Sequence, residues 1–308
     1  MATPRYIDNK ETFMSNSYTH SFRVRFQECD SLGTVGIIHY LYYIQETAMA
    51  HSAELGYTAE SELAKGIVWM IRETEIEFLR PLRYGDTLDV TMSIGDLRRI
   101  SAARNYELRA RKTGDLIATA RSEFVAVDME SQRPIPIPEY VIADFFPEGM
   151  PEKPLPRQRF PKAPPPPPKV FRTRKKVEWR DLDLQRHVNN AMYLSYMETA
   201  GADAASGIGW PMQHLLEYGQ FSVPRWSHVL YRGQAAIGDE LEIVSYVSDV
   251  RRSSWIRHDT IARVSDGAIL TRGHTRWVWI DLKTYRPCPI LAEFLADWDG
   301  YIADAGAA

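Results

Sequence analysis

The sequence predicts an α+β fold built from two copies of one unit, each with a long helix packed on an antiparallel sheet. Three observations predict it. The 308-residue chain matches itself at a single offset of 153 residues. Each matching half has one segment with helical periodicity, followed by segments in which apolar and polar residues alternate. A proline-rich stretch at residues 147–168 separates the halves.

The internal repeat rests on identical residues along most of the chain, all of which fit one offset without a gap. Chance matches would scatter over many offsets, so residues 22–137 and 175–290 are predicted to be duplicates of one unit. The matched pairs include Asp30 and Asp183, Tyr40 and Tyr193, Gly85 and Gly238, Asp96 and Asp249, Arg104 and Arg257, Val125 and Val278, and Pro134 and Pro287.

The helix of the first copy is predicted from its apolar residues. Leu41, Ile44, Ala48 and Leu55 recur at helical spacing, and Gly56 follows as a C-terminal stop. This pattern predicts a helix of about five turns.

Strands are predicted on both sides of this helix. Residues 73–78 and 88–94 alternate between apolar and polar side chains, which is the period of half-buried strands. Further strands are expected at 104–112 and 116–128, and a short one at 22–27. A lone unit would leave a sheet edge unpaired, so we expect the two copies to pair edge to edge.

The repeat and the prolines together predict the domain boundaries. We expect a first domain at residues 18–145, a linker at 146–170 and a second domain at 171–300. The prolines end in the run Pro164–Pro168, which is typical of a semi-rigid polyproline II spacer. A ligand for a proline-binding module is the alternative, but the position between two repeats favours the spacer.

Composition and charge exclude several classes of protein. The formal net charge of −3 gives no overall basic field, so neither nucleic acid nor a membrane surface is an expected partner. Residues 1–16 lack the features of a signal peptide and no apolar run approaches transmembrane length, which predicts a cytoplasmic protein. The two cysteines, Cys29 and Cys288, form neither a disulfide framework nor a zinc-binding motif. We expect two buried thiols and no metal or organic cofactor.

The densest polar cluster lies at residues 179–193, between a predicted strand and the helix of the second copy. A loop before a helix brings side chains and backbone N–H groups to one point, and the positive end of the helix dipole favours a developing oxyanion there. Hydrolysis of a thioester needs such a site and an activated water, whereas the leaving thiolate, with a pKa of about 8.5, scarcely needs protonation. Asp183, His187 and two amide side chains suit this task.

Both halves resemble plant-type acyl-acyl-carrier-protein thioesterases, which are double hotdog enzymes. The stretch WRDLDLQRHVNNAMYL, residues 179–194, resembles that family's second-half signature. Residues 45–48 with His51, and residues 67–71, resemble its first-half helix and following strand. The loop at 28–35 is similar to the Asp-x-x-Gly-x-Val segment of single-hotdog 4-hydroxybenzoyl-CoA-type thioesterases, whose Asp is catalytic. The resemblance implies a tandem hotdog fold and hydrolysis of fatty acyl thioesters of acyl carrier protein or coenzyme A.

The family's catalytic residues map onto the second copy. Its Asp-x-Asn-x-His falls on Asp183, Gln185 and His187, so that the Asn is replaced by its longer homologue. A Glu-Cys pair of the family falls on Gln234 and Ala235, which leaves neither a Glu base nor a cysteine nucleophile there.

These residues have expected roles. Asp183 and His187 together position and deprotonate the water, Gln185 and Asn190 hold the carbonyl or the water, and N–H groups of the helix bind the oxyanion. The substrate-binding candidates are Asn189, Tyr193, Gln234, Arg251 and Arg252.

Structural explanations compete for several candidates. A helix cap would explain Asp183 and turn formation would explain Asn189 and Asn190, but a cap requires no histidine at 187. Arginines at strand ends, such as Arg251 and Arg252, are usually solvated, although phosphates of coenzyme A or an acidic carrier protein would also suit them.

The first copy carries a weaker version of the site. Asp30 matches Asp183, but the positions of His187, Asn189 and Asn190 hold Thr34, Gly36 and Ile37. Asp30 is either a second catalytic residue or a capping remnant. We therefore expect the second copy to perform most of the hydrolysis and the first to contribute apolar surface for the acyl chain.

Two other functions compete with a thioesterase. A hotdog hydratase or dehydratase also uses an Asp and a His, but such proteins resemble Asp-x-Asn-Pro-x-His, which has a Pro and one residue more than Asp183 to His187 offers. A non-catalytic acyl-thioester sensor is the third candidate, although no DNA-binding segment is evident. The acyl length, the carrier and assembly into a homo-oligomer of double hotdog units stay open.

Overall fold

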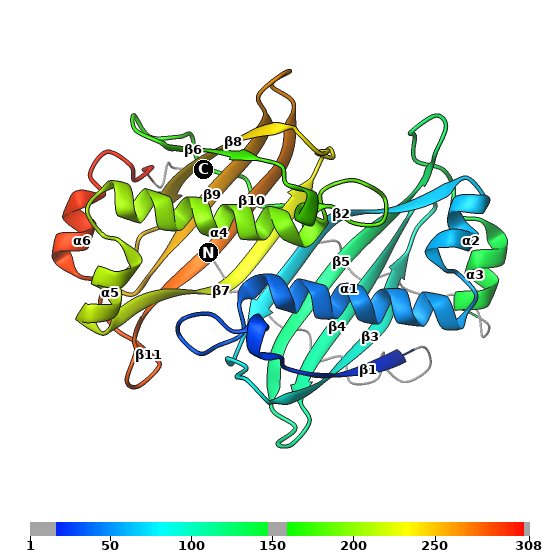
Figure 1. The fold of residues 1–308 in the computed structure, drawn as a ribbon, viewed down its shortest axis with the longest axis horizontal. Coiled ribbons are helices and arrows are strands. Elements are labelled where there is room, and N and C mark those ends of the chain that lie inside the picture. Colours follow the sequence, from blue (N-terminus) through cyan, green and yellow to red (C-terminus); the bar gives the residue numbers. More distant parts are fainter. Residues whose placement is uncertain (1–16, 147–158, 305–308) are drawn as a thin grey trace. The chain divides into compact units, whose positions relative to one another are not determined.

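The computed structural model describes residues 17–146 and 159–304, which form two compact units (Figure 1). One unit contains residues 17–34, 42–71 and 82–146. The other contains residues 35–41, 72–81 and 159–304. Two segments of the first sequence repeat, 35–41 and 72–81, therefore pack with the second copy.

The first unit is an antiparallel sheet in the order β1-β3-β4-β5 with the long helix α1 against it. The guanidinium of Arg104 on β4 donates to the Ala48 carbonyl of α1 at 2.8 Å, which ties the helix to the sheet. The elements of the first half are β1 Ser17–Arg23, the 3-10 helix η1 Phe26–Glu28, α1 Ile37–Glu54, α2 Ala59–Ala64, β2 Ile67–Phe78, β3 Thr87–Leu97, β4 Ser101–Ala110, β5 Leu116–Asp128 and α3 Glu139–Phe145.

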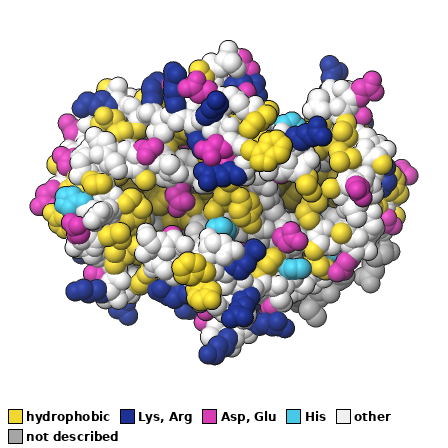
Figure 2. All heavy atoms as spheres, in the orientation of Figure 1, with side chains coloured by type: hydrophobic (Ala, Val, Ile, Leu, Met, Phe, Trp, Pro, Cys, Tyr) yellow, Lys and Arg dark blue, Asp and Glu magenta, His cyan; other side chains and the backbone are white. Residues whose placement is uncertain are grey.

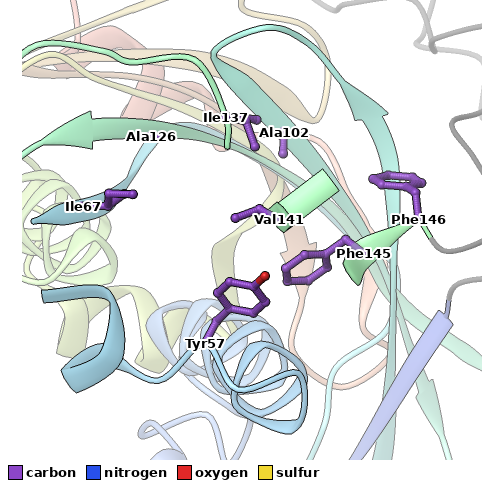
Figure 3. Close-up of a cluster of buried hydrophobic side chains, with 8 residues drawn as sticks. All are labelled: Tyr57, Ile67, Ala102, Ala126, Ile137, Val141, Phe145 and Phe146. Carbon is purple, nitrogen blue, oxygen red and sulfur yellow. The ribbon is translucent and has the colours of Figure 1, made fainter. Parts of the chain in front are cut away.

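A cluster of buried apolar side chains lies at one end of the first unit, where α3 covers the strands (Figure 3). Burial of these side chains supplies much of the stabilisation of that end, because apolar surface leaves water. Its members are Tyr57, Ile67, Ala102, Ala126, Ile137, Val141, Phe145 and Phe146.

The second unit repeats this arrangement, with strand order β7-β10-β9-β8-β6 and the helix α4. Its sheet is extended by the end of β2, since Glu73–Glu77 pair antiparallel with Trp226–Leu230 of β7. The elements are β6 Phe171–Lys176, the 3-10 helix η2 Trp179–Asp181, α4 Asn190–Gly207, α5 Met212–Tyr218, β7 Gln220–Tyr231, β8 Glu240–Ser248, β9 Ser254–Arg263, β10 Ile269–Asp281, β11 Arg286–Pro287 and α6 Ala292–Asp297.

The predicted duplication is confirmed within each unit. Helices α1 and α4 both have 18 residues, which is the predicted five turns. The same buried contact recurs at the base of each helix: the Tyr43 hydroxyl donates to Glu28 at 2.7 Å, and the Tyr196 hydroxyl donates to Asp181 at 2.7 Å. The α+β prediction is therefore correct.

One predicted strand is wrong. The segment 22–27 was expected to be a strand, but β1 spans Ser17–Arg23 and Phe26–Glu28 form a 3-10 turn. The reason is that β1 alternates between exposed and half-buried side chains and depends on pairing with β3. Its own sequence, SYTHSFR, has too few apolar residues to mark a strand. The short helices α2, α3, α5 and α6 were not predicted.

The described part of the linker packs on the second unit. Residues 159–168 contain no helix or strand. The ring of Phe160 lies 5.0 Å from that of His228, and the Tyr246 hydroxyl donates to the Pro164 carbonyl at 2.7 Å. Residues 147–158 of the predicted linker lie outside the described residues.

On the face shown in Figure 2, basic and acidic side chains are mixed over most of the surface, and basic side chains predominate along its lower edge. This mixing agrees with the small net charge of −3. Among the described residues, no helix has both the length and the hydropathy required to cross a membrane.

Candidate active site

The loop between η2 and α4 forms a tight turn that brings Asp183 and His187 together. The Asp183 N–H donates to the His187 carbonyl at 2.9 Å, and the Arg186 N–H donates to the Asp183 carbonyl at 3.0 Å. The Asp183 carboxylate accepts from the Gln185 N–H at 2.9 Å. The two residues expected to activate water therefore flank one turn, directly before the helix. The Gln185 side chain is exposed.

A segment after β7 anchors this loop. The Val188 N–H donates to the Ala235 carbonyl at 2.9 Å, and the Ala235 N–H donates to the Tyr193 hydroxyl at 2.9 Å. The Tyr231 hydroxyl donates to the Asn190 carbonyl at 3.1 Å. The backbone of Gln234, adjacent to Ala235 in the chain, therefore lies next to the loop.

The start of α4 is capped by Asn189. Its side chain accepts from the Ala191 N–H at 2.9 Å, and its own N–H donates to the Asp181 carbonyl at 2.9 Å. The Met192 N–H donates to the Asn189 carbonyl. Three amide groups at this end of the helix are thus engaged within the protein. Any of these N–H groups would have to give up its hydrogen bond within the protein in order to donate to an oxyanion.

Burial shifts the pKa values of two groups at this site, Asp183 and Tyr193. Burial raises the pKa of the half-buried Asp183 carboxyl, although the N–H groups of Gln185 and His187 oppose that shift. Burial also raises the pKa of Tyr193 to about 12, so this phenol stays neutral. The Nδ1 atom of His187 is buried and has no hydrogen-bond partner among the described residues. Asp183 is accordingly a stronger base than a solvated carboxylate.

The matching loop of the first copy has the same backbone but a self-contained carboxylate. The Asp30 N–H donates to the Thr34 carbonyl at 2.8 Å, as Asp183 does to His187. The Asp30 carboxylate accepts from the Leu32 N–H at 2.9 Å, from the Thr34 N–H at 3.1 Å and from the Thr34 hydroxyl at 3.2 Å. Its hydrogen bonds therefore close the turn.

The arginine candidates lie elsewhere. Arg251 and Arg252 are exposed in the turn between β8 and β9, and Arg251 forms an ion pair with Asp249 at 3.0 Å. Strand β8 spans Glu240–Ser248, so this turn lies roughly 25 Å along the strand from the segment that anchors the catalytic loop. The structure does not bring the two arginines to Asp183.

Sequence reasoning missed the residue that holds Gln234 in place. The Arg263 guanidinium donates to the Gln234 carbonyl at 2.6 Å and forms an ion pair with Asp239 at 3.0 Å. No local pattern could have identified it, because Arg263 is on β9 and is 29 residues away from Gln234. Tyr231 and Ala235 were missed as loop contacts for the same reason.

The possible sulfur and metal chemistry of the site depends on the cysteines and on the side chains that could bind a metal ion. Ala235, at the family's cysteine position, is fully buried. Cys29 and Cys288 are free and only half-buried, which corrects the expectation of two buried thiols. Among residues 17–146 and 159–304, no group of three His, Cys, Asp or Glu side chains is arranged to bind a metal ion.

Comparisons with known families match each half. Residues 15–145 match the acyl-ACP thioesterase N-terminal domain, and residues 177–298 match the thioesterase-like superfamily. The resemblance to acyl-acyl-carrier-protein thioesterases predicted from the sequence is therefore confirmed.

Individual relatives give the same result. A chloroplastic palmitoyl-acyl carrier protein thioesterase of Gossypium hirsutum is 25% identical over 278 residues, which are 84% of this chain and 63% of the relative. A chloroplastic acyl-[acyl-carrier-protein] hydrolase of Cuphea viscosissima is 22% identical over 270 residues, 84% of this chain and 62% of the relative. The chain thus spans less than two thirds of the length of these relatives.

Solved structures confirm the double hotdog fold. The putative oleoyl thioesterase of Lactobacillus plantarum superposes with a TM-score of 0.74 at 19% identity, covering 85% of this chain and 96% of that one. The 12:0-ACP thioesterase of Umbellularia californica gives 0.68 at 18% identity, covering 85% and 93%.

Proposed function

We propose that this relative of the acyl-acyl-carrier-protein thioesterases hydrolyses fatty acyl thioesters to free fatty acid and thiol. The observation that carries the proposal is the turn at the start of α4, which holds a half-buried carboxylate, Asp183, four residues before His187. Family resemblance along both halves supports the same reaction.

The chemistry follows from this turn. A water held by Asp183 and His187 attacks the thioester carbonyl, and its proton passes to Asp183, whose raised pKa favours acceptance. Collapse of the tetrahedral intermediate breaks the C–S bond and expels the thiolate, which needs little protonation at neutral pH. Gln185, Asn190 and Gln234 provide amide groups around the carbonyl in this proposal. Asn189 stabilises the helix start as its cap.

The two copies have different roles in the reaction. The second-copy loop performs the hydrolysis, and the first copy contributes apolar surface for the acyl chain. The support is the state of Asp30, whose carboxylate accepts three hydrogen bonds from its own loop and has Thr34 in place of a histidine.

The test is thiol release, measured with a thiol reagent, from acyl-carrier-protein and coenzyme A esters of several chain lengths. We expect release that is linear in enzyme concentration. Consumption of an enoyl thioester at the absorbance of its conjugated bond, without thiol release, would indicate a hydratase instead. Binding without either reaction would indicate a sensor.

Three further proposals accompany the activity. The duplicated domains are residues 18–145 and 171–300, with the linker between them. The enzyme acts in the cytoplasm. Double hotdog units assemble into homo-oligomers. The curated relatives are chloroplastic, so the location requires its own measurement, by fractionation of cells that express the whole protein. Light scattering measures the oligomeric state.

A further inference from the structure

Three large apolar side chains are exposed around the catalytic turn. Trp179 is 81% exposed, Leu184 is 87% exposed and Ile237 is 53% exposed. The segments that carry them are joined by hydrogen bonds. The Leu182 N–H donates to the Trp179 carbonyl, and the chain at Ala235, two residues before Ile237, anchors the loop. Large apolar side chains exposed on segments that are bonded to one another are typical of an interaction site.

Positive charge accompanies them. Arg186, at the tip of the same turn, is exposed and forms no ion pair with another described residue. The Arg180 side chain is 78% exposed and lies 3.0 Å from Glu178. Apolar surface beside guanidinium groups is the composition found where proteins bind acidic partners.

The backbone at Arg186 has a conformation that an arginine adopts at a cost. Arg186 has φ +64°, a left-handed conformation that favours glycine, and the matching residue of the first copy is Gly33 with φ +71°. An arginine costs stability at this position. No ion pair within the described part of the chain offsets that cost, and the Arg186 guanidinium is left available to a binding partner.

The two copies differ in which exposed residues they carry at this turn. The first copy also exposes an aromatic residue before its turn, Phe26 at 77%, so exposure of Trp179 alone does not distinguish the active copy. Leu184 and Arg186 do, since Ser31 and Gly33 occupy their positions in the first copy. The added leucine and arginine occur only beside the complete Asp and His pair.

We propose that Leu184 and Arg186, with Trp179, form a docking surface for an acidic carrier protein that delivers the acyl thioester to Asp183 and His187. This proposal rests on the proposed function. A protein carrier presents both apolar and acidic surface, whereas coenzyme A offers its phosphates to an arginine but has little use for an exposed leucine.

The test uses the residues of the first copy as substitutions in the full chain, Leu184→Ser and Arg186→Gly. We expect KM for an acyl-carrier-protein substrate to rise about tenfold in each variant, with kcat little changed. The short acyl-N-acetylcysteamine thioester, which lacks both protein and phosphate, should be hydrolysed as by the wild type. Arg186→Gly should also raise the melting temperature, because glycine fits the left-handed backbone.

A matched control is Arg111→Gly, which removes an exposed arginine from the turn after β4. It should leave both substrates unaffected. An equal loss with acyl-coenzyme A would show that Arg186 binds phosphate and would overturn carrier docking. An equal rise in KM for the short thioester would also overturn carrier docking, because that substrate carries no protein.

Direct binding separates this proposal from the proposed function. Calorimetry with the acyl carrier protein should show about tenfold weaker binding to Arg186→Gly than to the wild type. Wild-type protein that released no thiol from any ester would contradict the proposed function, while this binding difference would still uphold or refute the docking surface.

Discussion

At the scale of single residues, the two loops show how one backbone can carry two functions. Both turns are closed by the same N–H to carbonyl bond, from Asp30 to Thr34 and from Asp183 to His187. The Asp30 carboxylate also accepts from the Thr34 hydroxyl, whereas the second turn has a histidine at that position. The side chain opposite the carboxylate is therefore what distinguishes a cap from a candidate base.

Replacement of Asp183 tests this distinction. Asp183→Asn keeps the volume of the side chain and its hydrogen bond from Gln185, but it removes the base. Positioned acid and base groups typically contribute about 10²–10⁴ in rate, so turnover should fall by that order. His187→Ala should resemble it if the two residues act as a unit.

Asp30→Asn is the matched control and should cost far less. All three variants are compared by thiol release, after native melting has been verified. A collapse of turnover in Asp30→Asn with near-normal rates in Asp183→Asn would place the chemistry in the first copy.

At the scale of elements, three adjacent strands of the second unit place a row of buried histidines on one face. His274 on β10 is paired in register with His228 on β7 and with His258 on β9. Phe160 of the linker lies 5.0 Å from His228 and 6.4 Å from His274. The histidines therefore lie between the sheet and the docked linker.

The surroundings of His258 and His274 keep these two rings uncharged at neutral pH. Burial lowers the pKa of His258 to about 4, and the Ser248 hydroxyl lies 2.8 Å from its Nε2. Burial, with help from His258, His228 and Arg276, lowers the pKa of His274 to about 3. A proton on either ring is unfavourable because it would be buried beside other basic groups.

Acid should therefore destabilise this face. Well above pH 6.5, the ordinary pKa of histidine, both side chains are neutral in the folded and unfolded chains. As the pH falls from 6.5 toward 4, the unfolded chain binds protons that the folded chain does not. The free energy of unfolding should drop by up to about 1.4 kcal/mol per pH unit for each histidine. Urea unfolding between pH 7.5 and 4.5 measures this slope.

A variant isolates the contribution of one ring. His274→Phe should reduce the loss of stability on acidification, because it removes one group that titrates in the unfolded chain only. The half-buried His214, which stacks on Trp210 at 5.1 Å, provides the control substitution His214→Phe. If His274→Phe and the wild type lost stability in parallel, the buried row would not be the cause.

At the scale of the whole molecule, the compact units do not coincide with the sequence repeats. Residues 35–41 and 72–81 precede the linker, yet they belong to the second unit. Tyr40 and Phe78, one from each segment, pack ring to edge at 5.2 Å, and Glu73–Glu77 pair with β7. The second repeat by itself therefore lacks part of its own unit.

Expression of residues 159–308 alone should give an unstable product. The unpaired edge of β7 would expose backbone N–H and carbonyl groups together with apolar side chains, which favours aggregation. Coexpression with residues 1–158 should restore a cooperative thermal transition and thiol release. A monomeric, cooperatively melting 159–308 fragment would contradict the assignment of the two segments to the second unit.

Activity is predicted to need no metal ion. The catalytic turn offers one carboxylate and one histidine, too few ligands for a closed site. Dialysis of the enzyme against EDTA should leave thiol release unchanged. Loss of activity that zinc restores would refute this expectation.

The sequence by itself determined the duplication, the long helix of each copy and the turn that carries Asp183 and His187. These features are local: helical and strand periodicity, and the turn chemistry of a loop before a helix, depend on residues close together in the chain. A constant offset of 153 residues then carried each assignment from one copy to the other.

Only the tertiary structure decided which distant segments meet at the turn. It brought Gln234 and Ala235 to the loop, placed Arg251 at the far end of β8, and assigned residues 72–81 to the second unit. The physical reason is that strand pairing depends on hydrogen bonds and packing between segments far apart in the chain. That pairing is not written in the periodicity of either segment.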